Sequence, residues 1–347
     1  MQSRKPKPTR PHQSGGELAL LSTIRARAAA ITSASIRLGI GDDCALLRLR
    51  AGEELAVTTD LSIEGRHFQL AWHPPESIGH RTLARGLSDL AAMGARPVAA
   101  FLSLGLPREL TVSAPGVRPR SQSWVDRFFA GLLALATEHS VPLAGGDLAE
   151  SPIAVADIVL TGAVPQGKAL LRSGAAQGDR IYVTGSLGGA AAELAALANS
   201  PQAFAKRTTA AGDSPHLYPQ PRIAQGIWLR KHGLASSAMD LSDGLSTDLA
   251  RLCQASGVTA EVDAAAIPLG AAATLAHALH GGEDYELLFT APASAKVPRK
   301  IAGVAVTAIG RITPATTRGS RVKLLTGKNS EPLEPQGWEH FSGASRP

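Results

Sequence analysis

Short apolar runs alternate with amphipathic helical segments in two successive series, and this alternation limits the fold more than any other feature. The first series contains ELAVTT, a helical pattern around 77–93, VAAFLSLGL and the helical stretch WVDRFFAGLLALATEH. The second contains IYVTG, a helical pattern over 190–198, and SAMDLSDG leading into LSTDLARLCQ. Strands that alternate with helices are typical of sheets covered by helices. The sequence therefore predicts two α/β domains, which we place at 17–165 and 166–347.

The composition agrees with a protein of this class. The 347 residues are enough for two domains that each bury a core, and 35 glycines with only 4% aromatic residues suit closely packed helices and tight turns. The apolar stretch ELALLSTI is too short for a membrane span and is followed by Arg25 and Arg27, unlike a signal peptide. Cys44 and Cys253 belong to no CxxC pair, so we expect neither a zinc cluster nor a disulfide framework. These features predict a cytoplasmic protein.

The net charge of +6 raises the question of a nucleic-acid partner. Four basic residues lie in residues 1–16, where no acidic residue offsets them. The other 31 Lys and Arg (35 minus these four) face 29 Asp and Glu, and they form no long basic stripe. We therefore expect no nucleic-acid surface and no membrane contact. We expect residues 1–16 to form a disordered basic tail, and residues 111–123 to form a surface loop inserted before the next helix.

Acidic residues recur beside glycines along the chain, first in GIGDDCALLRLRAGEELAVTTDL. We expect strands near 44–49 and 55–59 to form a hairpin whose turn contains Gly52. An antiparallel hairpin would gather three carboxylates and two hydroxyls at one edge. These groups belong to Asp42, Asp43, Thr58, Thr59 and Asp60. A solvated turn beside an ordinary strand end is the alternative for this stretch.

Two further acidic positions belong to the first series. Asp89 lies off the leucine stripe of the helix at 77–93, with Arg85 one turn earlier, so a surface salt bridge is the alternative to a functional role. In VPLAGGDLAESP an apolar strand is expected to end in Gly-Gly-Asp, where two glycines let the backbone approach a phosphate or metal closely. A glycine turn with Asp147 as a helix cap is the alternative there.

The most informative stretch of the second series is AMDLSDGLSTDLARLCQ. Its leucines recur at the spacing of one helical face, and Ser242 or Asp243 would cap that helix. Asp240 and Ser242 are two residues apart on an extended segment and so point the same way. The alternative is a capping box at the start of this helix, which would explain one acid and one hydroxyl but not Asp240. The later stretch LHGGEDYELLFT again places two glycines and acids before an apolar strand, and a simple turn is the alternative.

Five such places put carboxylates where the functional loops of α/β domains gather. Two carboxylates about 4 Å apart repel by roughly 1 kcal/mol in water and by about 4 kcal/mol at an effective dielectric of 20. Several cations are needed to offset that repulsion. Oxygen ligands, with no His or Cys at metal spacing, select hard cations, and Mg²⁺ with bound phosphates is the usual combination. The pattern predicts a phosphoryl-transfer or nucleotide-dependent enzyme.

Residues 162–169, GAVPQGKA, come one residue short of the phosphate-binding pattern G-x-x-x-x-G-K-[ST]. Ala169 offers no hydroxyl to a Mg²⁺ ion, and Pro165 removes a backbone N–H from the phosphate-binding loop. Glycines follow too soon for the helix whose N-terminus would hold the phosphate. We interpret the stretch as the junction between the two domains.

The ordered motifs of the chain closely resemble the thiamine-monophosphate kinase family, within the superfamily of aminoimidazole-ribonucleotide synthetase and selenophosphate synthetase. The match runs from about Gly39 to GWEHF through GIGDDCALL, TTDLSIEGRHF, LSDLAAMGARP, LAGGDL, LLRSGAAQGDRIYVTG, AMDLSDGLSTDL and GGEDYELLFT. The resemblance implies an α/β (α+β) fold of the aminoimidazole-ribonucleotide-synthetase type, whose N-terminal sheets pair in a homodimer. It also implies in-line transfer of phosphate from ATP to thiamine monophosphate with several Mg²⁺ ions, yielding thiamine diphosphate without a phosphoenzyme.

The resemblance assigns roles to matching positions. The implied metal ligands are Asp43, Thr58, Thr59, Asp60, Asp89, Asp147, Asp240 and Asp243, and the implied catalytic residues are Asp60, Asp89, Asp147 and Asp243. The implied ATP contacts are Gly146, Asp147, Arg172 and Ser242. The implied contacts with thiamine monophosphate are His67, Glu283 and Trp338, and a carboxylate with an aromatic ring suits a planar cation. Leu148 and Ala149 stand where the family usually has two threonines, so these positions offer no hydroxyl contact.

Two alternatives stay open. Another synthetase of the superfamily would activate a carbonyl oxygen or selenide with ATP. A selenophosphate synthetase would carry a reactive Cys or selenocysteine and a Lys upstream of its glycine-rich acidic motif, and the segment before Gly41 has neither. An aminoimidazole-ribonucleotide synthetase would lack GRHF and WEHF. The other alternative is a non-catalytic nucleotide-binding regulator. The complete acidic set argues against it, because a binding protein needs fewer metals.

Overall fold

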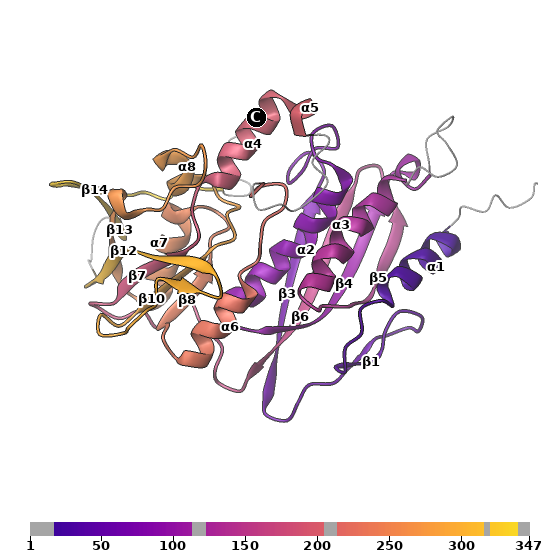
Figure 1. Cartoon of the computed structure of the whole chain (residues 1–347), viewed down its shortest axis with the longest axis horizontal. Coiled ribbons are helices and arrows are strands. Elements are labelled where there is room, and N and C mark those ends of the chain that lie inside the picture. Colours follow the sequence, from indigo (N-terminus) through magenta and orange to yellow (C-terminus); the bar gives the residue numbers. More distant parts are fainter. Residues whose placement is uncertain (1–16, 113–122, 205–213, 316–319, 339–347) are drawn as a thin grey trace, which may run out of the picture.

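The computed structural model describes residues 17–112, 123–204, 214–315 and 320–338, which form two sheet-based halves side by side (Figure 1). The tail predicted at 1–16 lies outside the described residues, and so does most of the loop predicted at 111–123. No helix within the four described ranges has both the length and the apolar character needed to cross a membrane.

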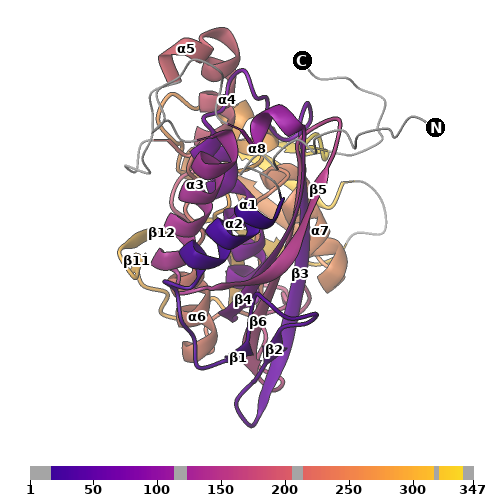
Figure 2. The same cartoon turned by 90° about the vertical axis from the view of Figure 1, so that its right-hand side faces the viewer.

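The N-terminal half is built on a four-stranded sheet in the order β3-β6-β4-β5. Its elements are α1 (Glu17–Ala28), β1 (Ile36–Leu38), β2 (Leu46–Leu47), β3 (Glu53–Ile63), α2 (Pro75–Ala92), β4 (Arg96–Leu106), η1 (Arg108–Leu110), α3 (Trp124–Glu138), β5 (Leu143–Glu150) and β6 (Val155–Pro165). Strands β3 and β4 pair antiparallel with β6, whereas β4 and β5 are parallel. Helices α2 and α3 lie together on one face of this sheet (Figure 2).

The C-terminal half contains a sheet whose described strands follow the order β14-β13-β9-β12-β7-β10-β8, with β11 beside β12. Its strands are β7 (Arg180–Thr184), β8 (Ser237–Asp240), β9 (Thr259–Asp263), β10 (Leu287–Ala291), β11 (Lys300–Ile301), β12 (Val304–Thr313), β13 (Val322–Thr326) and β14 (Asn329–Pro332). Its helices are α4 (Gly189–Asn199), α5 (Pro201–Phe204), α6 (Ile223–His232), α7 (Leu245–Ser256), η2 (Ala264–Ala266) and α8 (Leu275–His280). Only the β13–β9 pair is parallel among these described strands.

Helix α2 joins the two halves, and its sequence explains why it forms. Leu83, Leu87 and Leu90 are each at most 1% exposed, as their helical spacing predicts. Pro75 opens the helix, where its missing N–H costs no hydrogen bond. The helix contacts β3 and β6 on one side and α6 and β8 on the other. One apolar cluster therefore runs through both halves, from Leu87 to Leu229 and Phe289, and fixes their relative position.

The hairpin predicted from the 44–49 and 55–59 strands is wrong. Strand β2 pairs with β1, while β3 pairs with β6 along its whole length, from Glu53–Pro165 to Ile63–Val155. An eleven-residue partner with buried apolar side chains outweighs a short local pairing. A turn signal cannot reveal a partner strand that is about a hundred residues away.

The predicted helices at 77–93, 124–139, 190–198 and 245–254 form as α2, α3, α4 and α7. The junction GAVPQGKA is the end of β6 followed by a turn, in which the Lys168 N–H donates to the Pro165 carbonyl at 3.0 Å. Residues 166–179 contain no helix. A phosphate-binding loop is therefore absent from this stretch.

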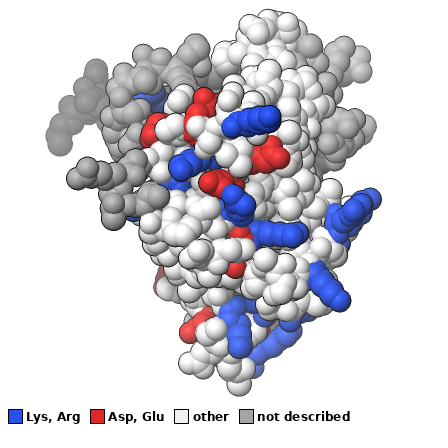
Figure 3. Space-filling model, turned by 90° about the vertical axis from the view of Figure 1, so that its left-hand side faces the viewer, with Lys and Arg blue, Asp and Glu red and all other residues white. Residues whose placement is uncertain are grey.

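Charge is mixed on the face drawn in Figure 3, which belongs to the C-terminal half. Lys and Arg side chains on that face are separated by Asp, Glu and uncharged surface, and the described residues form no continuous basic stripe there. Nucleic-acid backbones are bound by clustered positive charge. Positive and negative side chains are therefore interspersed on this face.

Candidate active site

One face of α2 carries the polar side chains at the centre of the molecule. Arg81, Arg85 and Asp89 are four residues apart, and Ser88 lies beside them one turn after Arg85, so all four project from the same side of the helix. Ser88 is fully buried and Arg81 is 4% exposed. Polar groups at this depth need partners. Both halves of the chain supply those partners.

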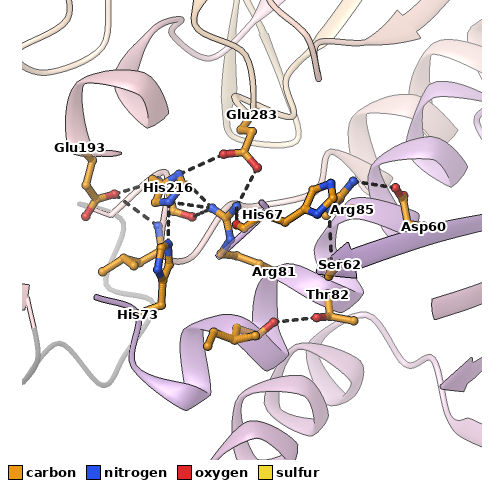
Figure 4. Close-up of polar contacts among 12 residues, drawn as sticks. Asp60, Ser62, His67, His73, Arg81, Thr82, Arg85, Glu193, His216 and Glu283 are labelled. Carbon is orange, nitrogen blue, oxygen red and sulfur yellow. Dashed lines mark hydrogen bonds and ion pairs between the residues drawn. The ribbon is translucent and has the colours of Figure 1, made fainter. Parts of the chain in front are cut away.

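The N-terminal half supplies partners from β3. Arg85 Nη2 donates to Asp60 Oδ1 at 3.0 Å, and its Nη1 lies 3.3 Å from Ser62 Oγ (Figure 4). The Thr58 hydroxyl donates to Asp89 Oδ2. Alternate residues of a strand face the same side, so Thr58, Asp60 and Ser62 all meet α2. Two carboxylates, Asp60 and Asp89, are thereby brought together.

The C-terminal half supplies partners from the end of β8. Ser88 Oγ donates to Asp240 Oδ2 at 2.7 Å, and Asp240 is only 4% exposed. Asp243 lies three residues further along and is paired with Arg251 Nη1. The carboxylates of the two halves therefore meet across the interface that α2 forms.

The loop between β8 and α7 is held by a residue that the sequence pattern did not single out. The fully buried Asp248 accepts hydrogen bonds from the N–H groups of Ser242 at 3.1 Å and Asp243 at 2.9 Å. The prediction that Ser242 or Asp243 caps α7 is wrong, because the N-cap is Gly244 and no side chain caps the helix. Asp248 binds the loop amides, so the side chains of Ser242 and Asp243 are left to line the cleft.

These groups surround a cleft of about 330 Å³ between the two halves. Its lining consists of Asp60, Arg66, His67, Arg85, Asp89, Leu194, Asp240, Ser242, Asp243, Gly281, Glu283, Tyr285 and Trp338. Five of these side chains are carboxylates and two are arginines. The cleft is therefore strongly acidic.

Burial changes the protonation of the cleft carboxylates. It raises the pKa of Asp60 to about 6 and that of Asp240 to about 8, and the nearby charge of Asp89 adds to both increases. The Arg85 guanidinium opposes the increase at Asp60. Burial also raises the pKa of Asp89, against the effect of the Thr58 hydroxyl. One arginine does not balance this group, so a bound cation would relieve the repulsion.

The cleft fits a hard cation by the chemistry of its donors rather than by a preformed cage. Within the described ranges, no three His, Cys, Asp or Glu side chains are close enough to hold one metal ion together. The facing groups of Asp60, Asp89, Asp240 and Asp243 are all carboxylate oxygens, which suit Mg²⁺. Phosphate oxygens commonly complete such a coordination shell.

A second cavity of about 710 Å³ lies between α1, the loop before β2 and strand β5. Asp43, Gly146 and Asp147 line it. Strand β5 continues through Gly-Gly-Asp to Glu150, so the expectation that the strand ends there is wrong. Gly146 has φ +148°, and a Cβ at this position would lie 1.9 Å from the Leu102 carbonyl oxygen. Only glycine fits there.

The remaining candidates lie away from the cleft. Thr59 donates to Asp157 Oδ1 at 2.9 Å on the sheet face opposite α2. Asp147 and Asp157 both pair with Ser103, so Asp147 shares that face. Arg172 is exposed and does not line the cleft, although its charge opposes the increase in the pKa of Asp89. The sheet therefore separates Thr59 and Asp147 from the cleft within a single chain.

Several polar residues around the cleft escaped the sequence analysis. Arg81 and Ser88 lie one helical turn from residues that were singled out, so their spacing is a signal that could have found them. His73 and His216 are 143 positions apart in the chain, and their ring nitrogens lie 3.0 Å from each other. No local pattern connects two such positions.

Comparisons with known proteins cover most of the chain. The family described as AIR synthase related protein, N-terminal domain, matches residues 41–167, and AIR synthase related protein, C-terminal domain, matches residues 176–323. Thiamine-monophosphate kinase of Escherichia coli (strain K12) is 40% identical over 321 residues, which are 88% of this chain and 93% of that protein.

Solved structures agree with these matches. The crystal structure of thiamine-monophosphate kinase from Stenotrophomonas maltophilia K279a has a TM-score of 0.74 and 37% identity, covering 89% of this chain and 96% of that one. The structure of AaThiL complexed with AMPPCP and TMP has a TM-score of 0.69 and 30% identity, covering 96% and 99%. Because both domains match and a relative is 40% identical over 88% of this chain, the chain belongs to the thiamine-monophosphate kinase family.

Proposed function

We propose that this protein transfers the terminal phosphoryl group of ATP to the phosphate of thiamine monophosphate, forming thiamine diphosphate and ADP. The observation that carries the proposal is the convergence of Asp60, Asp89, Asp240 and Asp243 in one cleft, from separate elements of both halves. A kinase that joins two phosphate compounds must offset much negative charge, and its acidic residues do so by holding cations. Family membership supports the choice of substrates.

Several Mg²⁺ ions belong to this proposal. The residues that would hold them are Asp43, Thr58, Thr59, Asp60, Asp89, Asp147, Asp240 and Asp243. The raised pKa values of Asp60, Asp89 and Asp240 and the oxygen donors of the whole set support this choice. Bound Mg²⁺ would screen the phosphate oxygens and so lower the barrier to in-line transfer.

The protein's own contribution is to hold its charged groups in place. Arg85 holds Asp60, the Thr58 hydroxyl holds Asp89 and Ser88 holds Asp240, so these carboxylates do not reorganise when substrates bind. We propose catalytic roles for Asp60, Asp89, Asp147 and Asp243, and ATP contacts for Gly146, Asp147, Arg172 and Ser242. Direct transfer requires no nucleophile of the protein, and no phosphoenzyme forms in this mechanism.

The other end of the cleft suits a planar cation. Glu283 supplies a carboxylate and Trp338 supplies an aromatic ring, and both line the cleft with His67. The His67 Nδ1 accepts the Ile63 N–H at 3.0 Å, which places the proton of the neutral ring on Nε2. We propose that these three residues bind thiamine monophosphate.

We propose further that two copies associate through the N-terminal half. Strand β3 is an edge strand, and its outer face exposes Leu55, Val57 and Leu61 at 50%, 60% and 45%. Exposed apolar edge strands are normally covered. In this proposal residues 17–165 bind metal and ATP and form the dimer, residues 166–347 form the C-terminal α/β domain, and the reaction takes place in the cytoplasm.

A coupled assay of ADP release, with and without thiamine monophosphate, tests the proposal. We expect ADP release to require thiamine monophosphate and Mg²⁺. ADP release that ignores the thiamine compound would instead support another ATP-dependent synthetase of the superfamily. Binding of ATP without any turnover would support a nucleotide-binding regulator.

A further inference from the structure

Behind Glu283 lies a cluster of buried polar side chains to which the proposed reaction gives no role. His216, His73 and Arg81 are 1%, 3% and 4% exposed, and they come from three separate segments of the chain. Figure 4 shows them close together, with Glu283 beside His216 and Arg81. Buried polar groups of this kind are costly unless each is satisfied.

The two histidines form a chain of polar contacts that ends at Glu283. His73 Nδ1 contacts both the N–H and the carbonyl oxygen of Gln69, at 3.1 Å and 3.2 Å. His73 Nε2 lies 3.0 Å from His216 Nε2, and His216 Nδ1 lies 3.2 Å from Glu283 Oε2. The chain therefore connects the backbone before α2 to the carboxylate through two buried rings.

Arg81 completes the arrangement. Its Nη2 donates to Glu283 Oε1 at 2.7 Å and to the His67 carbonyl oxygen at 3.2 Å. Its Nη1 donates to the His216 carbonyl oxygen and also lies 2.9 Å from His216 Nδ1. One oxygen of the Glu283 carboxylate therefore contacts Arg81 and the other contacts His216. Arg81 also ties Glu283 to the backbone of His67, so two of the proposed substrate contacts share one anchor.

The charges agree with these hydrogen bonds. Burial lowers the pKa of His73 to about 2 and also lowers that of His216, so both rings are neutral. Burial alone would raise the pKa of Glu283, but the Arg81 charge and the His216 hydrogen bond hold it well below its usual value. Glu283 is therefore an ionised acceptor at the wall of the cleft.

The backbone conformation also restricts the position of the Glu283 side chain. Glu283 and Tyr285 have φ values of +61° and +50°, in the left-handed region that non-glycine residues seldom adopt. The Glu283 N–H donates to the Ser242 carbonyl oxygen at 2.8 Å, and the Tyr285 N–H donates to the Leu241 carbonyl oxygen at 2.9 Å. The strained turn is thus held against the loop that carries Asp243.

We propose that His73, His216 and Arg81 are positioning residues, which hold Glu283 ionised and directed so that it accepts the amine and cationic ring of thiamine monophosphate. The inference rests on the proposed function for its substrate. In this proposal the His216 Nδ1–H donates to Glu283, and the tautomer of His216 tests that part independently of the substrate.

Two substitutions of His216 separate positioning from packing. His216→Asn keeps an N–H group near the place of Nδ1, whereas His216→Leu has a similar volume and no donor. We expect His216→Leu to raise the KM for thiamine monophosphate at least tenfold, with kcat and the KM for ATP changed less than threefold. For His216→Asn, kcat and both KM values should stay within threefold of the wild type. Equal losses in both variants, or equal increases in both KM values, would overturn the proposal.

The tautomer of His216 provides a test that needs no turnover. Nitrogen NMR of the full-length protein labelled at histidine should show His216 with its proton on Nδ1, the signal being assigned with His216→Asn. A proton on Nε2 of His216 would refute donation from this ring to Glu283. A wild-type enzyme without thiamine-dependent ADP release would refute the proposed function, and the correct tautomer in that case would leave Glu283 positioned for another cationic amine.

Discussion

At Asp60 the alternation of one strand decides which side chains reach the cleft. Asp60 and Thr58 face α2, whereas Thr59 faces the opposite side of the sheet and contacts Asp157. Arg85 fixes the orientation of the Asp60 carboxylate. Burial and the neighbouring Asp89 raise the pKa of Asp60 to about 6, which makes it sensitive to any bound cation.

Replacing Asp60 by Asn tests its place in the reaction. Asn retains an acceptor oxygen for Arg85 but removes the charge that a metal needs, so we expect kcat to fall by at least about 100-fold with an unchanged fold. ADP release and circular dichroism measure the two effects. Glu331→Gln, at an exposed carboxylate on β14, is the matched control and should behave as the wild type. Near-normal activity of Asp60→Asn would mean that the metal centre lies elsewhere.

His80 gives a residue-scale prediction about pH. Burial lowers its pKa to about 4, while the unfolded chain titrates near 6.5. Below pH 6.5 the unfolded state therefore takes up a proton that the folded state does not, and the free energy of unfolding falls as the pH drops toward 4. The slope for this one group is at most about 1.4 kcal/mol per pH unit.

Urea unfolding at pH 7, 6 and 5 checks this contribution. His80→Gln can still donate to the Pro219 carbonyl oxygen, which His80 Nε2 meets at 2.8 Å, but it does not titrate. We expect the variant to lose less stability than the wild type between pH 6.5 and 5. Equal losses would show that His80 is protonated in the folded protein.

At the scale of elements, α2 and β3 do most to place the proposed site. Helix α2 contacts both halves, and its polar face meets β3 through Arg85 and β8 through Ser88. Strand β3 presents its inner face to α2, while its outer face exposes apolar side chains at the edge of the sheet. One strand thus serves both the proposed cleft and the proposed dimer.

If two copies pair through β3, a charged substitution on its outer face should change the mass of the particle in solution. Val57→Lys places a charge in the apolar face, and its burial against a second copy would be costly, so the variant should sediment as a monomer at micromolar concentration. The wild type should sediment as a dimer. Leu269→Lys, at a residue that is 45% exposed on the C-terminal half, should match the wild type. A wild-type monomer would exclude this interface.

Helical periodicity made α2 predictable, whereas no local pattern made the partner of β3 predictable. The leucines of α2 lie three and four residues apart, and local spacing is enough to define such a face. The β3–β6 ladder joins Glu53 to Pro165, and competition between distant strands is settled by total burial rather than by local turn residues. The hairpin prediction failed for that reason.

At the scale of the whole molecule, the two halves share one apolar core, and the acidic cleft lies at their junction. Carboxylates held together in this way repel each other until a cation binds. Folding therefore stores an unfavourable interaction that ligand binding relieves. The stability of the protein should accordingly depend on the cation.

Thermal unfolding tests that dependence. Mg²⁺ with a nonhydrolysable ATP analogue should raise the Tm well beyond the effect of Na⁺ at equal ionic strength, because screening alone does not neutralise a buried cluster. Asp60→Asn and Asp240→Asn should reduce the Mg²⁺ effect, whereas Glu331→Gln should not. Equal shifts with Na⁺ and Mg²⁺ would count against a clustered metal site.

The sequence by itself determined the α/β class, the main helices and the candidate carboxylates, because these depend on local spacing and on the neighbours of each acid. Only the tertiary structure decided which of them meet. Asp60, Asp89, Asp240 and Asp243 share one cleft, whereas Asp43 and Asp147 line another cavity. The contact between His73 and His216 also arises only when α2 packs between both halves. Contacts between distant segments depend on how complete elements bury their surfaces, and no local sequence pattern contains that information.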